Sequence, residues 1–221
     1  MLKPWATLAA MALSATAVSA QSTAPKYHQA TVSQAGGIPY PINAQQPGFV
    51  SLDVLVDTRG AVQNVIVVRD VPPLTAAAEN AVKTWQFTPA TLNGDAVAGI
   101  VRVNVAFNPF NPSGVGLPGG PLQPAQARVV ADFQPPGLLK AGYAVYPPNT
   151  VAYGTVVLDV KVGSDGSVRD VTVNLGKDSI NTPSINAAKT WQFTPATFQG
   201  KTLAANTVVV FVFAPPQANT R

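Results

Sequence analysis

The sequence predicts an α+β protein with two small domains, each a mainly antiparallel three-stranded sheet with a helix packed on one face. A nine-residue block that begins at Lys83 returns unchanged at Lys189, an offset of 106 residues. At the same offset, 29 of the 70 positions in residues 40–109 and 146–215 are identical. Each copy holds segments of period-two alternation around one segment with apolar residues at helical spacing. The chain is therefore a duplicated unit of roughly 70 to 95 residues, large enough for a small core.

The repeat sets the expected boundaries. They are a signal peptide at 1–20, a lead-in at 21–37, a first domain at 38–109, a Pro/Gly-rich linker at 110–137, a second domain at 138–215 and a disordered tail at 216–221. We expect the lead-in to be loosely attached, with Tyr27, His28 and Val32 as candidate strand residues. The linker is expected to be an extended tether of up to roughly 90 Å, at about 3.1 Å per residue. Residues 128–133 could form a short strand on the second domain.

The N-terminus has the pattern of a secretory signal. Lys3 precedes an apolar run of about fourteen residues, and Val18, Ser19 and Ala20 form a small-residue cleavage site. A membrane-spanning helix needs about 20 apolar residues, so a cleaved leader and a periplasmic location are favoured. An uncleaved inner-membrane anchor is the alternative. Because the chain has no cysteine, each domain has to be held together by its core.

Composition and charge disfavour several classes of function. Only 11% of residues are charged and the net charge is +4, with neither copy strongly basic, so a nucleic-acid surface is not expected. His28 is the sole histidine and has no carboxylate cluster near it in the sequence. Asp57 and Asp165 stand beside glycines without the spaced oxygen ligands of a calcium loop, and are read as turn residues. We expect no metal, no cofactor and no enzymatic activity.

Two strands around a glycine turn open each copy. In the first copy, residues 50–56 alternate between apolar and polar, and residues 57–60 form a turn with Gly60 at the left-handed position. After the turn the apolar positions are Val62, Val65 and Val67. The first has an even number and the other two have odd numbers, so the period-two alternation is interrupted between them. The second copy has the same pattern 106 residues later, so we predict a β-bulge in both.

A short helix and a tryptophan follow. The first helix is predicted from Leu74, directly after two prolines, and the second from Pro183 to Thr190 with Thr182 as its N-cap. The prolines of the block stop both helices. We expect six residues to be structural, the aromatic ones in the core, with ligand stacking as the lesser alternative. These are Trp85, Phe87, Pro89, Trp191, Phe193 and Pro195.

The last strands of the two copies differ. In the first copy four apolar residues are expected to face inward and Arg102, Asn104 and Ala106 to face outward. The inward residues are Val101, Val103, Val105 and Phe107. In the second copy Val209, Phe211 and Phe213 face inward, but the outward positions are also apolar. They are Val208, Val210 and Val212. Because a strand with two apolar faces has to be covered on both, we predict a second packing contact on the outer face of this strand.

The order of these features resembles the C-terminal domain of TonB-family energy transducers. The features are a Tyr-Pro pair, an alternating strand, a glycine turn, a helix ending in Trp-x-Phe-x-Pro-Ala, and a final strand that closes on Phe. The resemblance implies that each exposed last strand, at residues 101–107 and 207–213, accepts a segment of an outer-membrane transporter as an added strand. Tyr40 and Tyr146 are packing lids or partner contacts. The candidate partner-binding residues are Tyr40, Val101, Val103, Val105, Phe107, Tyr146, Val208, Val210 and Val212.

Two departures from the family bear on function. Members that transmit energy carry an uncleaved membrane helix followed by a long Pro-rich spacer, whereas here the leader has a cleavage site and the Pro-rich segment lies between the domains. We therefore expect a periplasmic adaptor that binds protein segments by strand addition, linked to TonB-dependent transport. The alternative is a structural or self-assembling envelope protein without a transport role. In that case the outward valines of the second copy drive homo-oligomerisation or docking of the two repeats.

Overall fold

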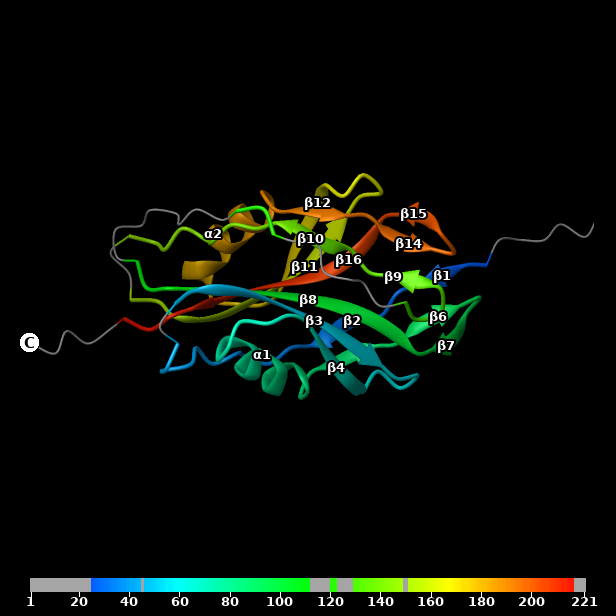
Figure 1. The fold of residues 1–221 in the computed structure, drawn as a ribbon, viewed down its shortest axis with the longest axis horizontal. Coiled ribbons are helices and arrows are strands. Elements are labelled where there is room, and N and C mark those ends of the chain that lie inside the picture. The colour runs from blue at the N-terminus through cyan, green and yellow to red at the C-terminus, as the bar shows by residue number, and fades with distance from the viewer. Residues whose placement is uncertain (1–24, 45, 112–119, 123–128, 149–150, 217–221) are drawn as a thin grey trace, which may run out of the picture.

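The computed structural model describes residues 25–44, 46–111, 120–122, 129–148 and 151–216 (Figure 1). The helices are α1 (Leu74–Val82) and α2 (Asp178–Ala188). The strands of the first half are β1 (Tyr27–His28), β2 (Thr31–Gln34), β3 (Gly48–Val56), β4 (Val62–Arg69), β5 (Gln86–Thr88), β6 (Ala90–Leu92), β7 (Asp95–Val97) and β8 (Gly99–Asn108). Those of the second half are β9 (Phe133–Gln134), β10 (Gly137–Lys140), β11 (Gly154–Val162), β12 (Val168–Leu175), β13 (Gln192–Thr194), β14 (Ala196–Phe198), β15 (Lys201–Leu203) and β16 (Ala205–Phe213).

The centre of the molecule is one six-stranded sheet with the order β12-β11-β16-β8-β3-β4. Each half supplies three antiparallel strands, as the sequence predicts. The two triplets are not separate sheets, because β8 and β16 lie side by side and parallel, with Val103 beside Val208 and Asn108 beside Phe213. We call this β8–β16 pairing the seam. The expectation of two separate three-stranded sheets is corrected by it.

The helices cover opposite faces of the sheet. In Figure 1, α2 lies above the central strands and α1 below them. α1 packs against β3 and β4, and α2 against β11 and β12. Parallel pairing explains the arrangement, because two similar halves joined through parallel last strands are related by a rotation about the strand direction. That rotation exchanges the two faces of the sheet.

The lead-in is an integral part of the first half. β2 pairs with β5, and Val32 is buried opposite Phe87; β1 pairs with β6. In the second half β10 pairs with β13 and β9 with β14 in the same way, with Leu138 opposite Phe193. The expectation of a loose attachment is therefore wrong, because these strands close the core over the tryptophan block. The repeated unit begins near Tyr27 and near Phe133.

Parts of the linker and the tail lie outside the described residues. Of the strand predicted at 128–133, only Phe133 lies in a strand, β9, which pairs with β14 of the second half. Ala131 and Asp132 form a turn with positive φ angles instead. The expected tether over residues 112–119 and 123–128 falls outside the described ranges, as do the predicted signal peptide and residues 217–221.

The hydrophobic core is shared between the two halves. The cluster beneath α1 contains Trp85 and also Val157, Val208, Val210 and Val212 from the second half. The cluster beneath α2 contains Trp191 together with Phe49 and Ala106 from the first half. Each helix therefore closes a core to which strands of both halves contribute.

The turn and bulge predictions are confirmed. The register shifts between Leu55 and Val56, and again between Lys161 and Val162, as an extra residue in β4 or β12 requires. Gly60 and Gly166 have φ angles of +86° and +81°. A second register shift, which the apolar pattern did not show, lies at the other end of each pair.

The start of the first helix is predicted correctly, whereas the start of the second and the ends of both are not. The prolines do not stop the helices, because α1 ends at Val82 and α2 at Ala188, and β5 or β13 follows before the proline. α1 begins at Leu74, directly after the prolines, as predicted. α2 begins at Asp178 instead of Pro183, and the proline lies inside it. The additional turn buries Ile180 completely and places Asp178 at the helix N-terminus, where a negative charge is favourable.

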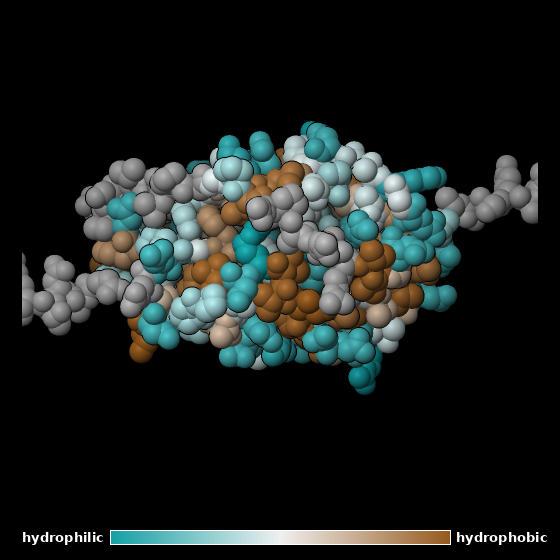
Figure 2. All heavy atoms as spheres, in the orientation of Figure 1, coloured by the Kyte–Doolittle hydropathy of each residue, from teal (hydrophilic) through white to brown (hydrophobic). Residues whose placement is uncertain are grey.

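The outer surface is mixed in character. Figure 2 shows hydrophobic residues in separate patches on the face viewed, one of them over the region of β8, bordered by hydrophilic residues. Large hydrophobic side chains that stay exposed include Ile42, Val151 and Tyr153. Scattered apolar residues of this kind are ordinary for a folded protein.

Candidate functional site

The two last strands, the predicted recognition edges, form the seam. β8 lies between β16 and β3, and β16 lies between β11 and β8, so the backbone of each is hydrogen-bonded on both sides. The expectation that these strands are exposed edges is therefore corrected. All seven candidate residues on them are buried, from Val101 at 4% exposure to Val210 at 0%. Strand addition here requires that the other half of the molecule first move away.

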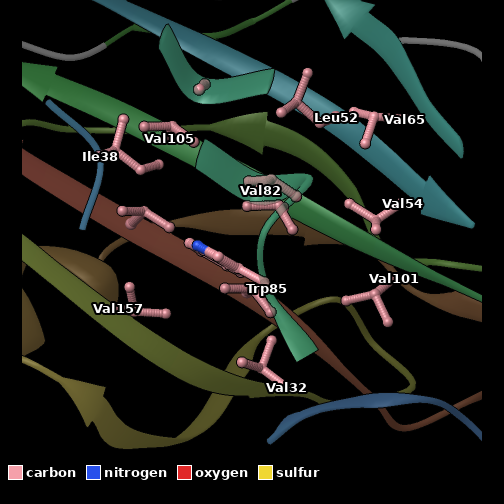
Figure 3. Packing of buried hydrophobic residues seen from close by; sticks show 14 of the residues in the cluster. Val32, Ile38, Leu52, Val54, Val65, Val82, Trp85, Val101, Val105 and Val157 are labelled. Atoms are coloured by element: carbon pink, nitrogen blue, oxygen red, sulfur yellow. The ribbon is translucent and has the colours of Figure 1, made fainter. Parts of the chain in front are cut away.

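The outward valines of β16 pack against the first half. Val208, Val210 and Val212 belong to the cluster beneath α1, so the predicted cover on both faces of this strand is present. Figure 3 shows the Trp85 side chain in the middle of this cluster, with Val82 and Val101 of the first half and Val157 of the second around it. Val208, Val210 and Val212 therefore dock the two repeats against each other.

A buried polar cluster lies on the other face of the seam. Arg102 donates from Nε and Nη2 to the two carboxylate oxygens of Asp53, both at 2.7 Å. The Ser51 hydroxyl donates to Asn104 Oδ1 at 2.8 Å, and Asn104 Nδ2 donates to Thr207 Oγ1 at 3.2 Å. Thr207 Oγ1 donates to the Arg102 carbonyl at 2.9 Å. We call Ser51, Asp53, Arg102, Asn104 and Thr207 the seam cluster; none of these residues is more than 2% exposed.

Because polar residues alternate with apolar ones in this strand, the sequence predicts a solvent face for Arg102 and Asn104. The structure covers that face with the second half. One signal could have revealed it. Asp53 stands opposite Arg102 in the β3–β8 register, and a neighbouring strand with two apolar faces needed a place to pack.

The two tyrosines of the Tyr-Pro pairs are placed differently. Tyr146 is buried, its ring packs edge-on against Phe213 at 5.6 Å, and its hydroxyl donates to the Ala152 carbonyl. Tyr40 is half-buried against the edge of Phe107 at 5.7 Å, and burial raises its pKa. Tyr40 is therefore the one of the pair that a partner can reach.

The tryptophan blocks close the two cores. Trp85, Phe87, Trp191 and Phe193 are all at or below 4% exposure, and Pro89 and Pro195 are partly exposed. Trp191 Nε1 donates to the Gly142 carbonyl at 3.0 Å. Within the described residues, the buried Trp85 Nε1 has no hydrogen-bond partner.

A groove beside α2 was not predicted. It has a volume of about 470 Å³ and lies between α2 and the segment that leads to β11. Its walls are mainly apolar, formed by Tyr143, Val145, Pro147, Pro148 and Pro183. Burial raises the pKa of Tyr143 to about 12, helped by nearby Tyr40.

Within the part of the chain that the structure describes, no three His, Cys, Asp or Glu side chains come together in a metal-binding group. His28 is exposed on β1. The same described residues contain no helix with the length and apolar character needed to cross a membrane.

The fold and the buried seam define a class of protein: a pair of similar α+β domains joined strand to strand. The family of Gram-negative bacterial TonB protein C-terminal domains matches residues 37–109 and 145–215, once in each half and over well more than half of the chain. The protein belongs to this family and carries two tandem domains of this periplasmic type. No curated protein and no solved structure matches the chain.

Proposed function

We propose that this protein is a non-catalytic structural module of the Gram-negative cell envelope, in which the last strands of two TonB C-terminal domains pair with each other. The observation that carries the proposal is the seam itself. The edge that the resemblance assigns to an external protein segment is occupied, in each half, by the other half.

The energy of the seam supports permanent closure. Full burial of one valine is worth about 1.5 to 3 kcal/mol, so Val208, Val210 and Val212 alone represent roughly 5 to 9 kcal/mol of transfer free energy. Exposure of these side chains therefore opposes opening of the seam.

A peptide titration tests this function. The isotope-labelled protein is titrated with N-terminal segments of TonB-dependent outer-membrane transporters while its amide resonances are followed by NMR. We expect the amides of β8 and β16 to keep their positions. A single-copy domain of the same family, which has no second half to close its last strand, is the positive control. Saturable shifts confined to β8 and β16 would refute permanent closure.

The second candidate is a periplasmic adaptor that binds partner segments by strand addition, in connection with TonB-dependent transport. The presence of two last strands at the positions given by the resemblance favours it. This function needs a seam that opens without global unfolding. Amide hydrogen exchange separates the two candidates. In an adaptor, the amides of β8 and β16 should exchange with solvent well before the amides of β3 and β11. Equal protection favours the structural module.

Export is part of the proposal and depends on residues 1–20, which lie outside the described ranges. Mass determination of the protein from a Gram-negative host is the test. A mature chain that starts at Gln21 supports a periplasmic module. A chain that retains Lys3 supports the alternative of an inner-membrane anchor.

A further inference from the structure

The hydrophobic pattern alone does not determine the register of the seam. In most sheets a slip of one residue moves apolar side chains from the core to solvent, and this penalty fixes the register. The run from Val208 to Phe213 in β16 is apolar on both faces, and both faces are buried. A slipped β16 would still present apolar residues to both cores. Something other than alternation has to fix the register.

The seam cluster can make its cross-seam bonds in one register only. Thr207 supplies both, since it accepts from Asn104 Nδ2 and donates to the Arg102 carbonyl. A slip of two residues would move its hydroxyl by about 6.6 Å along the strand, out of reach of these partners. Asn104 would then be left with an unsatisfied donor in a site that excludes water, which costs about 1 to 3 kcal/mol.

Four of the five cluster residues belong to the first half, and Thr207 belongs to β16 of the second half. The second-half residues equivalent to Ser51, Arg102 and Asn104 are Val157, Val208 and Val210. A seam between two copies of β16 would contain none of these three polar groups. A seam between two copies of β8 would have Val101 at the position of Thr207 and would leave Asn104 without its cross-seam partner. Only the pairing of β8 with β16 satisfies every hydrogen bond of the cluster.

We propose that the seam cluster determines the register and the partner of the seam, so that β8 pairs with the β16 of its own chain and in one alignment. Stability is not the reason for these polar groups, because apolar replacements of buried polar networks are often neutral or stabilising. A buried polar residue that fixes alignment has the same role in coiled coils, where a single asparagine sets the register at a cost in stability.

Disulfide trapping in the full chain tests the proposal, since the protein has no cysteine of its own. The pair Val103→Cys with Val208→Cys reports the observed register. The pair Val105→Cys with Val208→Cys reports a slip of two residues. Each pair is oxidised in the parent, in Thr207→Val, and in the triple variant Ser51→Ala, Asn104→Val, Thr207→Val. Products are separated into links within one chain and links between two chains.

In the parent we expect only the first pair to link, and only within one chain. In the triple variant we expect the slipped or interchain product to rise by about tenfold or more, as the loss of about two hydrogen bonds predicts. Thr172→Val, on the exposed part of edge strand β12, is the matched control and should behave as the parent. If the triple variant keeps the native disulfide as its sole product, the proposal is overturned. If the triple variant does not fold, the same readings on Thr207→Val decide.

Discussion

Gly60 holds a position that no other residue can occupy without strain. Its φ angle is +86°, and a Cβ at this position would lie 1.9 Å from the Phe87 carbonyl oxygen. The Phe87 amide also donates to the Gly60 carbonyl at 2.9 Å, so the turn is fixed to the block that follows the helix. This glycine therefore links the β3–β4 turn to the tryptophan block.

Replacement of Gly60 by alanine should lower the free energy of unfolding by more than 3 kcal/mol, because backbone strain of about 1 to 2 kcal/mol is added to a clash with the backbone. Gly94→Ala is the matched control, since its φ angle is +99° but nothing lies within 4 Å of the added Cβ. It should lose about 1 to 2 kcal/mol. Chemical denaturation measures both. Equal losses would show that the contact with Phe87 has no effect.

The two tryptophans should respond differently to phenylalanine. Trp191→Phe removes a hydrogen bond to Gly142, whereas Trp85→Phe removes an indole N–H that has no partner in the described structure. We expect Trp191→Phe to be the more destabilising by about 1 to 2 kcal/mol in denaturant unfolding. The opposite order would mean that Trp85 Nε1 is satisfied in solution.

Two tyrosines should make the protein sensitive to alkali. Burial raises the pKa of Tyr27 and of Tyr143 from the ordinary value of 10.0 to about 12. The stability linked to these neutral phenols is therefore fully present below pH 10.0 and is lost as the pH rises through about 12. Ultraviolet titration of phenolate should show a late phase that Tyr27→Phe and Tyr143→Phe together remove. A late phase that survives both changes would contradict the assignment.

At the scale of elements, β16 contributes to both cores at once. Val210→Ala should cost about 2 kcal/mol of stability, because this fully buried side chain belongs to the core beneath α1 in the other half. Val173→Ala, on edge strand β12 and 36% exposed, should change stability by less than about 0.5 kcal/mol. Thermal unfolding of the two variants is the measurement. A Val210→Ala protein as stable as the control would mean that β16 does not pack on the first half in solution.

The elements show where prediction from sequence succeeds. Period-two valines, left-handed glycines and paired prolines are local signals, and they gave the strands, the turns, the bulges and the start of α1. The start of α2 was missed because the burial of Ile180 outweighs the local preference for Pro183 at the first turn. The candidate strand residues of the lead-in, Tyr27, His28 and Val32, do lie in strands. Their firm attachment was missed because two to four residues carry little pattern until a neighbouring strand, here β5 or β6, is present.

At the scale of the whole molecule, the shared cores should make the two halves unfold together. Calorimetry should show one transition, and Val210→Ala should shift the whole of it. Each of the two tryptophans, Trp85 and Trp191, can be followed by fluorescence in a variant that lacks the other. Both should report the same shift of the unfolding midpoint. Two resolved transitions, or a shift seen at one tryptophan only, would indicate independent domains.

The relation between the halves was the least predictable feature. The duplication and the family resemblance were visible in the residues, and the apolar outer positions of β16 indicated a second contact. Nothing local identified β8 as the strand on the other side of that contact, because Arg102 and Asn104 have the pattern of a solvent face. Long-range pairing of this kind depends on complementarity between residues more than a hundred positions apart, such as Asn104 and Thr207.

The parallel seam also gives the Pro/Gly-rich segment a purpose other than spacing. The first half ends at Asn108, beside Phe213, whereas the second half begins at Phe133, which packs with Ile100 at the start of β8. The chain must therefore travel back along the length of a strand before it can start again, as every parallel pair requires. Because this segment joins the two halves covalently, their association is intramolecular and follows first-order kinetics. Their association is then independent of how much protein the cell makes, and dilution cannot reverse it.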